Sequence, residues 1–64
     1  MNLKEYRNAQ NLSQSEASRK LLITSDYLSM LETGKRTCSL KLVNSMAKLY
    51  KAPPEKIFLA INRT

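Results

Sequence analysis

Apolar residues recur at steps of three and four along most of the chain, which is the period of helices that bury one face. Leu3 and Tyr6 begin this pattern, and Leu28 and Leu31 continue it further along. The chain has one glycine and few β-branched residues, which favours helices joined by short turns. We therefore expect an all-α fold without strands, with five short helices at about residues 2–10, 14–21, 25–32, 40–50 and 54–61.

Polar residues stand where the expected helices begin. Ser13 and Glu16 have the spacing of a capping box, in which Ser13 accepts a hydrogen bond from the first turn and Glu16 reaches back to the cap. Further caps are expected at Thr24 and Ser39. The Pro53-Pro54 pair breaks the chain and presets the first turn of the last helix. Two residues are suited to end helices, Asn11 and Gly34.

The last two expected helices differ in how much apolar surface they carry. The stripe along 40–50 consists of Leu40, Val43, Ala47 and Tyr50, with Met46 at its margin. The helix at 54–61 has more apolar residues than one buried face requires. We expect the surplus, Phe58, Leu59 and Ile61, to be partly buried at a two-fold interface between two copies of the chain.

The charge balance favours an anionic partner. The 64 residues include 11 Lys and Arg against 5 Asp and Glu, which gives a net charge of +6. Nucleic acid is the first expectation, although a merely soluble basic domain would have the same balance. No apolar run approaches the roughly 20 residues that span a bilayer, so we expect no membrane association. The length fits a single domain covering residues 1–64.

Missing residue types exclude several kinds of chemistry. The chain has no His and one Cys, Cys38, so it offers neither an imidazole base nor an internal disulfide nor a cysteine zinc cluster. We expect no metal and no cofactor, a reducing cytoplasmic location, and an inert role for Cys38 in a loop or core. No nucleophile has a base beside it and no glycine-rich loop could hold phosphates, so we do not expect an enzyme.

The most informative segment lies between Gln14 and Thr33. It contains two short capped helices separated only by the break at residues 22–24. Helices joined so tightly must cross steeply, which is the helix-turn-helix arrangement. The outward face of the second helix is mostly small or polar, as expected of a helix that enters a DNA groove.

With these residues in place, the sequence resembles the phage-repressor, Cro/Xre-type helix-turn-helix DNA-binding domains. The segment Leu12-Ser13-Gln14-Ser15-Glu16 and the segment Leu31-Glu32-Thr33-Gly34-Lys35-Arg36 carry the resemblance. The match continues through Ser39-Leu40 and residues 46–48 to residues 55–58, so nearly the whole chain is covered. The resemblance implies a lambda-repressor-like domain with its helix-turn-helix at the second and third helices.

The resemblance also implies roles for individual residues. Positions that read base edges correspond to Ser25, Asp26, Ser29 and Met30. Positions that contact phosphates correspond to Gln14, Thr24, Lys35 and Arg36. Arg7 and Glu32 match a structural ion pair that joins the first helix to the end of the recognition helix. Two of the assignments have an alternative. We expect Tyr27 to contact phosphate through its hydroxyl, although it could instead pack on the domain edge, and we expect Met30 to touch a thymine methyl, although it could instead cover the core edge.

The sequence departs from the family pattern in three respects. Leu22 stands where the family usually has Gly, and a left-handed backbone is costly for Leu, which favours another conformation in the turn. Ala17 and Ser18 replace a usual Leu-Ala pair, which thins the expected packing between the two helices. Asp26 places a negative charge on the reading face, where it can accept from cytosine but repels phosphate.

These expectations lead to a leading function and two alternatives. The leading one is a sequence-specific DNA-binding transcriptional repressor that binds an inverted-repeat operator in the major groove as a homodimer. The first alternative is an antitoxin-like or adaptor module that binds a protein partner through the last helix and has only non-specific affinity for DNA. The second is an RNA-binding helical domain, which is disfavoured because no aromatic stacking platform is visible.

Overall fold

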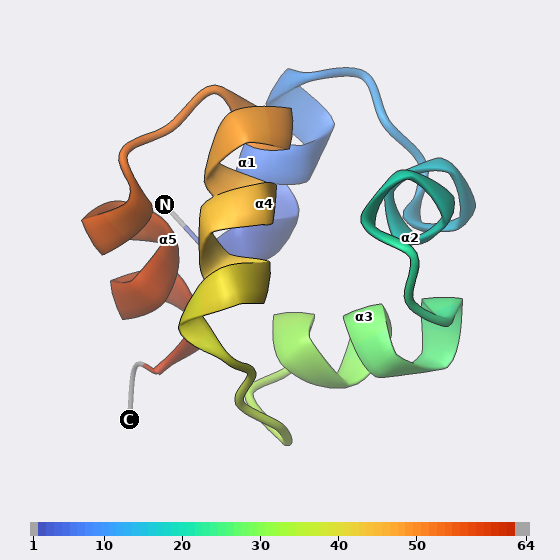
Figure 1. Ribbon diagram of the computed structural model, residues 1–64. Coiled ribbons are helices and arrows are strands. Elements are labelled where there is room, and N and C mark those ends of the chain that lie inside the picture. Colours follow the sequence, from blue (N-terminus) through green and yellow to red (C-terminus); the bar gives the residue numbers. More distant parts are fainter. Residues whose placement is uncertain (1, 63–64) are drawn as a thin grey trace.

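The computed structural model describes residues 2–62 and shows the expected all-α fold (Figure 1). Within these residues the helices are α1 (Leu3–Ala9), α2 (Gln14–Leu21), α3 (Ser25–Glu32), α4 (Leu40–Tyr50) and α5 (Pro54–Ile61). Helix α2 packs on α3, α4 packs on α5, and α1 contacts α3, α4 and α5. None of the helices in residues 2–62 has the length and apolar character that crossing a membrane requires.

Side chains cap the starts of four helices. The predicted capping box is confirmed: the Ser13 hydroxyl accepts from the Glu16 N–H at 3.0 Å, and the Ser13 N–H donates to the Glu16 carboxylate at 3.1 Å. That second bond holds the pKa of Glu16 below its ordinary value. Caps at Thr24 and Ser39 are confirmed as well. The sequence interpretation missed a further capping box at α1, formed by Asn2 and Glu5.

The ends of α1 to α4 share one backbone geometry. Each helix is followed by a residue with positive φ: Asn11, Leu22, Gly34 and Lys51. The next residue donates its N–H to the carbonyl five positions back, as in the bond of 3.0 Å from Ile23 to Ser18. The expectation of a different conformation at Leu22 is therefore wrong. Its φ of 61° and ψ of 40° are left-handed, because the capping bonds close the helix there and its side chain projects into solvent.

All five helices contribute to one core. Fully buried side chains include Leu3, Leu28, Leu31, Val43, Met46, Tyr50, Ile57 and Ile61. Ala17 and Ser18 are also buried, and the Ser18 hydroxyl donates to the Ser15 carbonyl at 2.9 Å, so the small residues bring α2 close to its neighbours.

Three expectations about burial need correction. Met46 is fully buried because it lies between Val43 and Tyr50 on the inward face of α4, at steps of three and four. Leu40 is exposed because it occupies the first position of α4, before the helix reaches the packed interior. Ile61 lies in the core of the single chain, one turn beyond Ile57, and so offers no surface to a second copy.

Candidate nucleic-acid interface

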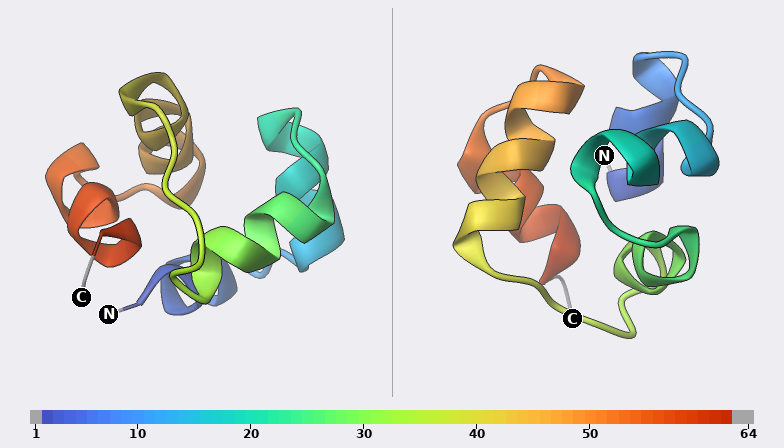
Figure 2. Two further views of the ribbon diagram at one scale, coloured as in Figure 1. Left: turned by 90° about the horizontal axis from the view of Figure 1, so that it is seen from below. Right: turned by 45° about the vertical axis from the view of Figure 1, so that its right-hand side comes forward.

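Helices α2 and α3 cross steeply after a turn of three residues. In Figure 1, α2 is seen nearly end-on while α3 lies across the view, and in the right panel of Figure 2 α3 is the helix seen end-on. The turn is short because the left-handed Leu22 reverses the chain and Thr24 at once caps α3, its hydroxyl accepting from the Tyr27 N–H at 3.0 Å. This arrangement is a helix-turn-helix.

The two faces of α3 have different surroundings. Leu28 and Leu31 point into the core and hold the helix against the domain. On the outward side, the predicted base-reading residues lie together: Ser25 and Asp26 are exposed, and Ser29 and Met30 are half-buried. The outward face therefore presents small polar side chains and one carboxylate to solvent. Hydroxyl and carboxylate groups of this kind can hydrogen-bond the edges of bases.

The loop after α3 carries two exposed cations, Lys35 and Arg36. It leaves the helix at Gly34, whose φ of 81° suits glycine. The loop is tied back to α3 by the Tyr27 hydroxyl, which donates to the Thr37 carbonyl at 3.1 Å. This bond places Tyr27 at the domain edge and uses its hydroxyl proton within the protein, which agrees with the packing alternative for this residue rather than with phosphate contact.

A network of hydrogen bonds joins α1, the start of α2 and the end of α3. Arg7 Nε donates to Glu32 Oε2 at 2.7 Å, so the predicted ion pair is present. A second guanidinium nitrogen of Arg7 donates to the Leu12 carbonyl at 2.8 Å. Gln14 Nε2 donates to Glu32 Oε1 at 3.0 Å, a bond between distant residues that local sequence patterns do not indicate. The bond to Glu32 fixes the Gln14 side chain at the first position of α2. That bond uses one N–H of the Gln14 amide and does not use the other.

Two titratable groups near the site are shielded from solvent, Tyr50 almost completely and Cys38 in part. Burial, reinforced by the negative charge of the Glu32 carboxylate, raises the pKa of Tyr50 to about 12. Its hydroxyl has no hydrogen-bond partner among the described residues. Burial also raises the pKa of the Cys38 thiol, which keeps it protonated and unreactive at neutral pH.

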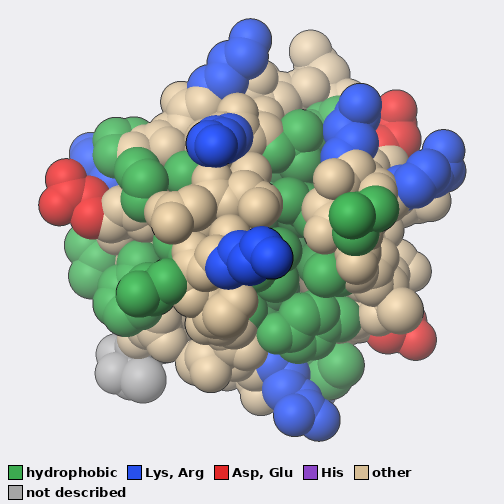
Figure 3. Space-filling view, in the orientation of Figure 1, with side chains coloured by type: hydrophobic (Ala, Val, Ile, Leu, Met, Phe, Trp, Pro, Cys, Tyr) green, Lys and Arg blue, Asp and Glu red, His purple; other side chains and the backbone are tan. Residues whose placement is uncertain are grey.

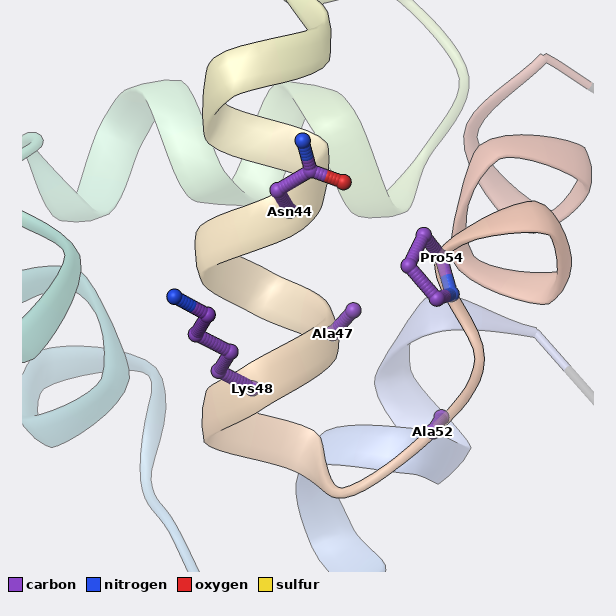
Figure 4. Close-up of a pocket in the computed structure, with 5 residues that line it drawn as sticks. All are labelled: Asn44, Ala47, Lys48, Ala52 and Pro54. Atoms are coloured by element: carbon purple, nitrogen blue, oxygen red, sulfur yellow. The ribbon is translucent and has the colours of Figure 1, made fainter.

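A metal ion or cofactor would need a cluster of ligands or a hollow in the described surface. Within residues 2–62, no group of three His, Cys, Asp or Glu side chains could hold a metal ion. A hollow of about 280 Å³ lies between α4 and α5, lined by Asn44, Ala47, Lys48, Ala52 and Pro54 (Figure 4). Figure 4 shows Lys48 extending away from Pro54, so its ammonium group is not directed into this hollow.

Comparison with known proteins agrees with this geometry. A family model described as "Helix-turn-helix" matches residues 3–57. The chain belongs to the Cro/Xre-type helix-turn-helix family. A helix-turn-helix relative from Archaeoglobus fulgidus, described as an uncharacterized HTH-type transcriptional regulator, is 33% identical over 57 residues, which span 89% of this chain and 80% of the relative. No solved structure matches the chain significantly. Helix-turn-helix domains of this family bind DNA and regulate transcription.

Proposed function

We propose that this helix-turn-helix protein is a sequence-specific transcriptional repressor that binds an inverted-repeat operator as a homodimer. The observation that carries the proposal is the outward face of α3, where Ser25, Asp26, Ser29 and Met30 lie together beside the cationic loop. In this proposal these four side chains contact base edges in the major groove. Binding over a promoter site would exclude other proteins from it.

Phosphate contacts in the proposal come from groups on both sides of α3. Lys35 and Arg36 supply charge from the loop, and Thr24 retains its hydroxyl proton as a donor. Gln14 donates from the start of α2, where the helix N-terminus favours an anion. Such contacts fix the orientation of the domain on DNA and make its affinity depend on salt, without selecting a sequence.

The proposed dimer forms through the outward side of α5. Phe58 and Leu59 are exposed there, with Leu59 66% accessible, while Ile57 and Ile61 hold the helix to the core. Successive major grooves on one side of DNA lie roughly 34 Å apart. Two domains with dimensions of 25 × 22 × 20 Å, placed side by side, can span that separation.

A selection from a random duplex DNA library at moderate salt tests the proposal. We expect enrichment of one inverted repeat by the wild-type protein. The triple variant with Ser25, Asp26 and Ser29 changed to Ala should retain DNA with a relaxed sequence preference, and Leu59→Ser should shift selection from an inverted repeat toward single half-sites. Retention without enrichment would contradict sequence-specific binding and would favour a protein partner. An unchanged preference in the triple variant would remove the assignment of these three residues.

A further inference from the structure

Leu22 is unusual in two respects at once. Its backbone is left-handed, a conformation that is unfavourable for a bulky residue, and its side chain is 91% exposed. Within the described residues, burial of this side chain therefore cannot compensate for the backbone cost. Non-glycine residues with a left-handed backbone cluster at functional sites, and contiguous exposed apolar surface marks sites of interaction.

Leu22 stands at the edge of an apolar groove of about 420 Å³. One wall is formed by Leu22 and Ile23 in the turn between α2 and α3, and Tyr27 of α3 adds its ring. The other wall is the first half of α4, with Leu42 and Lys41. Figure 3 shows this side of the molecule, where hydrophobic surface lies between basic side chains over α4 and others over α2. The volume falls within the roughly 300–1,000 Å³ of typical ligand sites.

The charges around the groove are positive. Lys41 lines the groove directly. Lys48 lies two helical turns further along α4, and its side chain extends to the side of α4 that faces α2 (Figure 4). Helix α4 has no acidic residue, and no Asp or Glu of the described chain lines the groove. The groove thus combines an apolar interior with a cationic edge, which is complementary to an apolar segment that carries carboxylates.

We propose that this groove binds an acidic amphipathic segment of a partner protein. Large apolar side chains of the segment would pack against Leu22, Ile23 and Leu42, and its carboxylates would pair with Lys41 and Lys48. Burial against the partner would then provide the contact that the Leu22 side chain lacks in the single chain.

Two other occupants fit the groove less well. A second copy of this chain carries the same net charge of +6, so its approach to a cationic edge is disfavoured. DNA has the right charge but would leave the apolar interior unfilled. None of the side chains proposed above to contact DNA lines the groove, so a partner there leaves the base-reading side chains open. The groove can bind such a partner whichever operator the protein recognises.

A labelled amphipathic helical peptide tests the proposal, with Leu on one face and Glu on the other. A matched peptide has Gln in place of Glu. We expect fluorescence anisotropy to show that the whole protein binds the acidic peptide and binds the Gln peptide several-fold more weakly. Amide chemical-shift changes should centre on residues 21–27 and 39–45. No binding, or changes centred on α5, would overturn the proposal.

Leu22→Gly is the diagnostic variant, since glycine adopts the left-handed backbone readily and the fold should be retained. We expect it to weaken peptide binding at least about tenfold, because it removes a leucine side chain from the contact. Lys41→Gln should weaken binding about threefold. Lys56→Gln, the same change at an exposed lysine of α5 outside the groove, should leave peptide affinity unchanged.

Two further results would overturn the assignment of the occupant. If Leu22→Gly leaves peptide affinity unchanged, the groove is not the binding site. If sedimentation shows that Leu22→Gly abolishes self-association of the protein, the groove binds a second copy. Competition with duplex DNA provides the last comparison: we expect DNA and peptide to bind together, and displacement of the peptide by DNA would make the groove part of the DNA-binding surface.

Discussion

The Arg7–Glu32 pair should be worth more in stability than an ordinary surface salt bridge. Its side chains are only 8% and 5% exposed, and the carboxylate also accepts from Gln14. Arg7→Met would leave the Glu32 carboxylate buried without a counter-charge and the Leu12 carbonyl without its guanidinium donor. Breaking one side of a buried pair typically costs about 3–5 kcal/mol. A domain of this length has roughly 3–10 kcal/mol of total stability, so the variant should be close to unfolding at room temperature.

The double variant Arg7→Met with Glu32→Met should be much more stable than the sum of the single changes predicts. It removes both charges together, and apolar side chains of similar length can then fill the space, which is often close to neutral for buried pairs. Urea unfolding followed by circular dichroism at neutral pH gives the four free energies of this double-mutant cycle. Losses in unfolding free energy that add to within about 0.5 kcal/mol would show that the two residues act independently, and the reasoning would be refuted.

Three further predictions concern the turn, the core and the cationic loop. Leu22→Gly should raise the unfolding free energy by up to about 1 kcal/mol, because relief of the left-handed strain exceeds the added chain entropy of glycine; a lower melting temperature would contradict this. Tyr50→Phe should be neutral or stabilising at pH 7, since the lost hydroxyl has no partner in the described chain. The raised pKa of Tyr50 favours the protonated phenol in the folded state, so the wild type should lose stability as the pH rises from 10 to about 12; urea unfolding of Tyr50→Phe should lack that component. Lys35→Gln and Arg36→Gln should each weaken DNA binding equally for all sequences. Each should also reduce the slope of the logarithm of the binding constant against the logarithm of salt concentration by about one. Anisotropy titrations that show a sequence-dependent loss of affinity would contradict phosphate contact.

Local patterns were sufficient to predict where the helices begin. Ser13, Thr24 and Ser39 each hydrogen-bond a backbone N–H within the next three residues, so the information lies in a few adjacent positions. The sequence also contained enough information to predict which face of the last helix is buried. Ile57 and Ile61 are four residues apart and share the buried face, whereas Phe58 and Leu59 lie on the exposed side. Grouping Ile61 with the outward residues overlooked this spacing.

Other features depend on contacts that local patterns do not contain. The left-handed backbone at Leu22 follows from the capping bonds that end α2. These bonds offset the preference of leucine for a right-handed or extended backbone. The exposure of Leu40 depends on which elements reach the first turn of α4, although its spacing matches the buried stripe. The bond between Gln14 and Glu32 joins residues 18 positions apart, so it required the packing of α3 against α1 and α2.

The position of α3 is fixed at both ends by residues outside its proposed reading face. At its start, the Thr24 hydroxyl caps the helix, and at its end Glu32 is bound to Arg7. Between these two ends, Leu28 and Leu31 bury the inward side of α3 in the core. Ser25 and Asp26, in contrast, are exposed, so changes there alter the surface offered to DNA with little effect on packing. The fold therefore separates the residues that stabilise the helix from those proposed to select a sequence, and the base preference of such a domain can change while its core is kept.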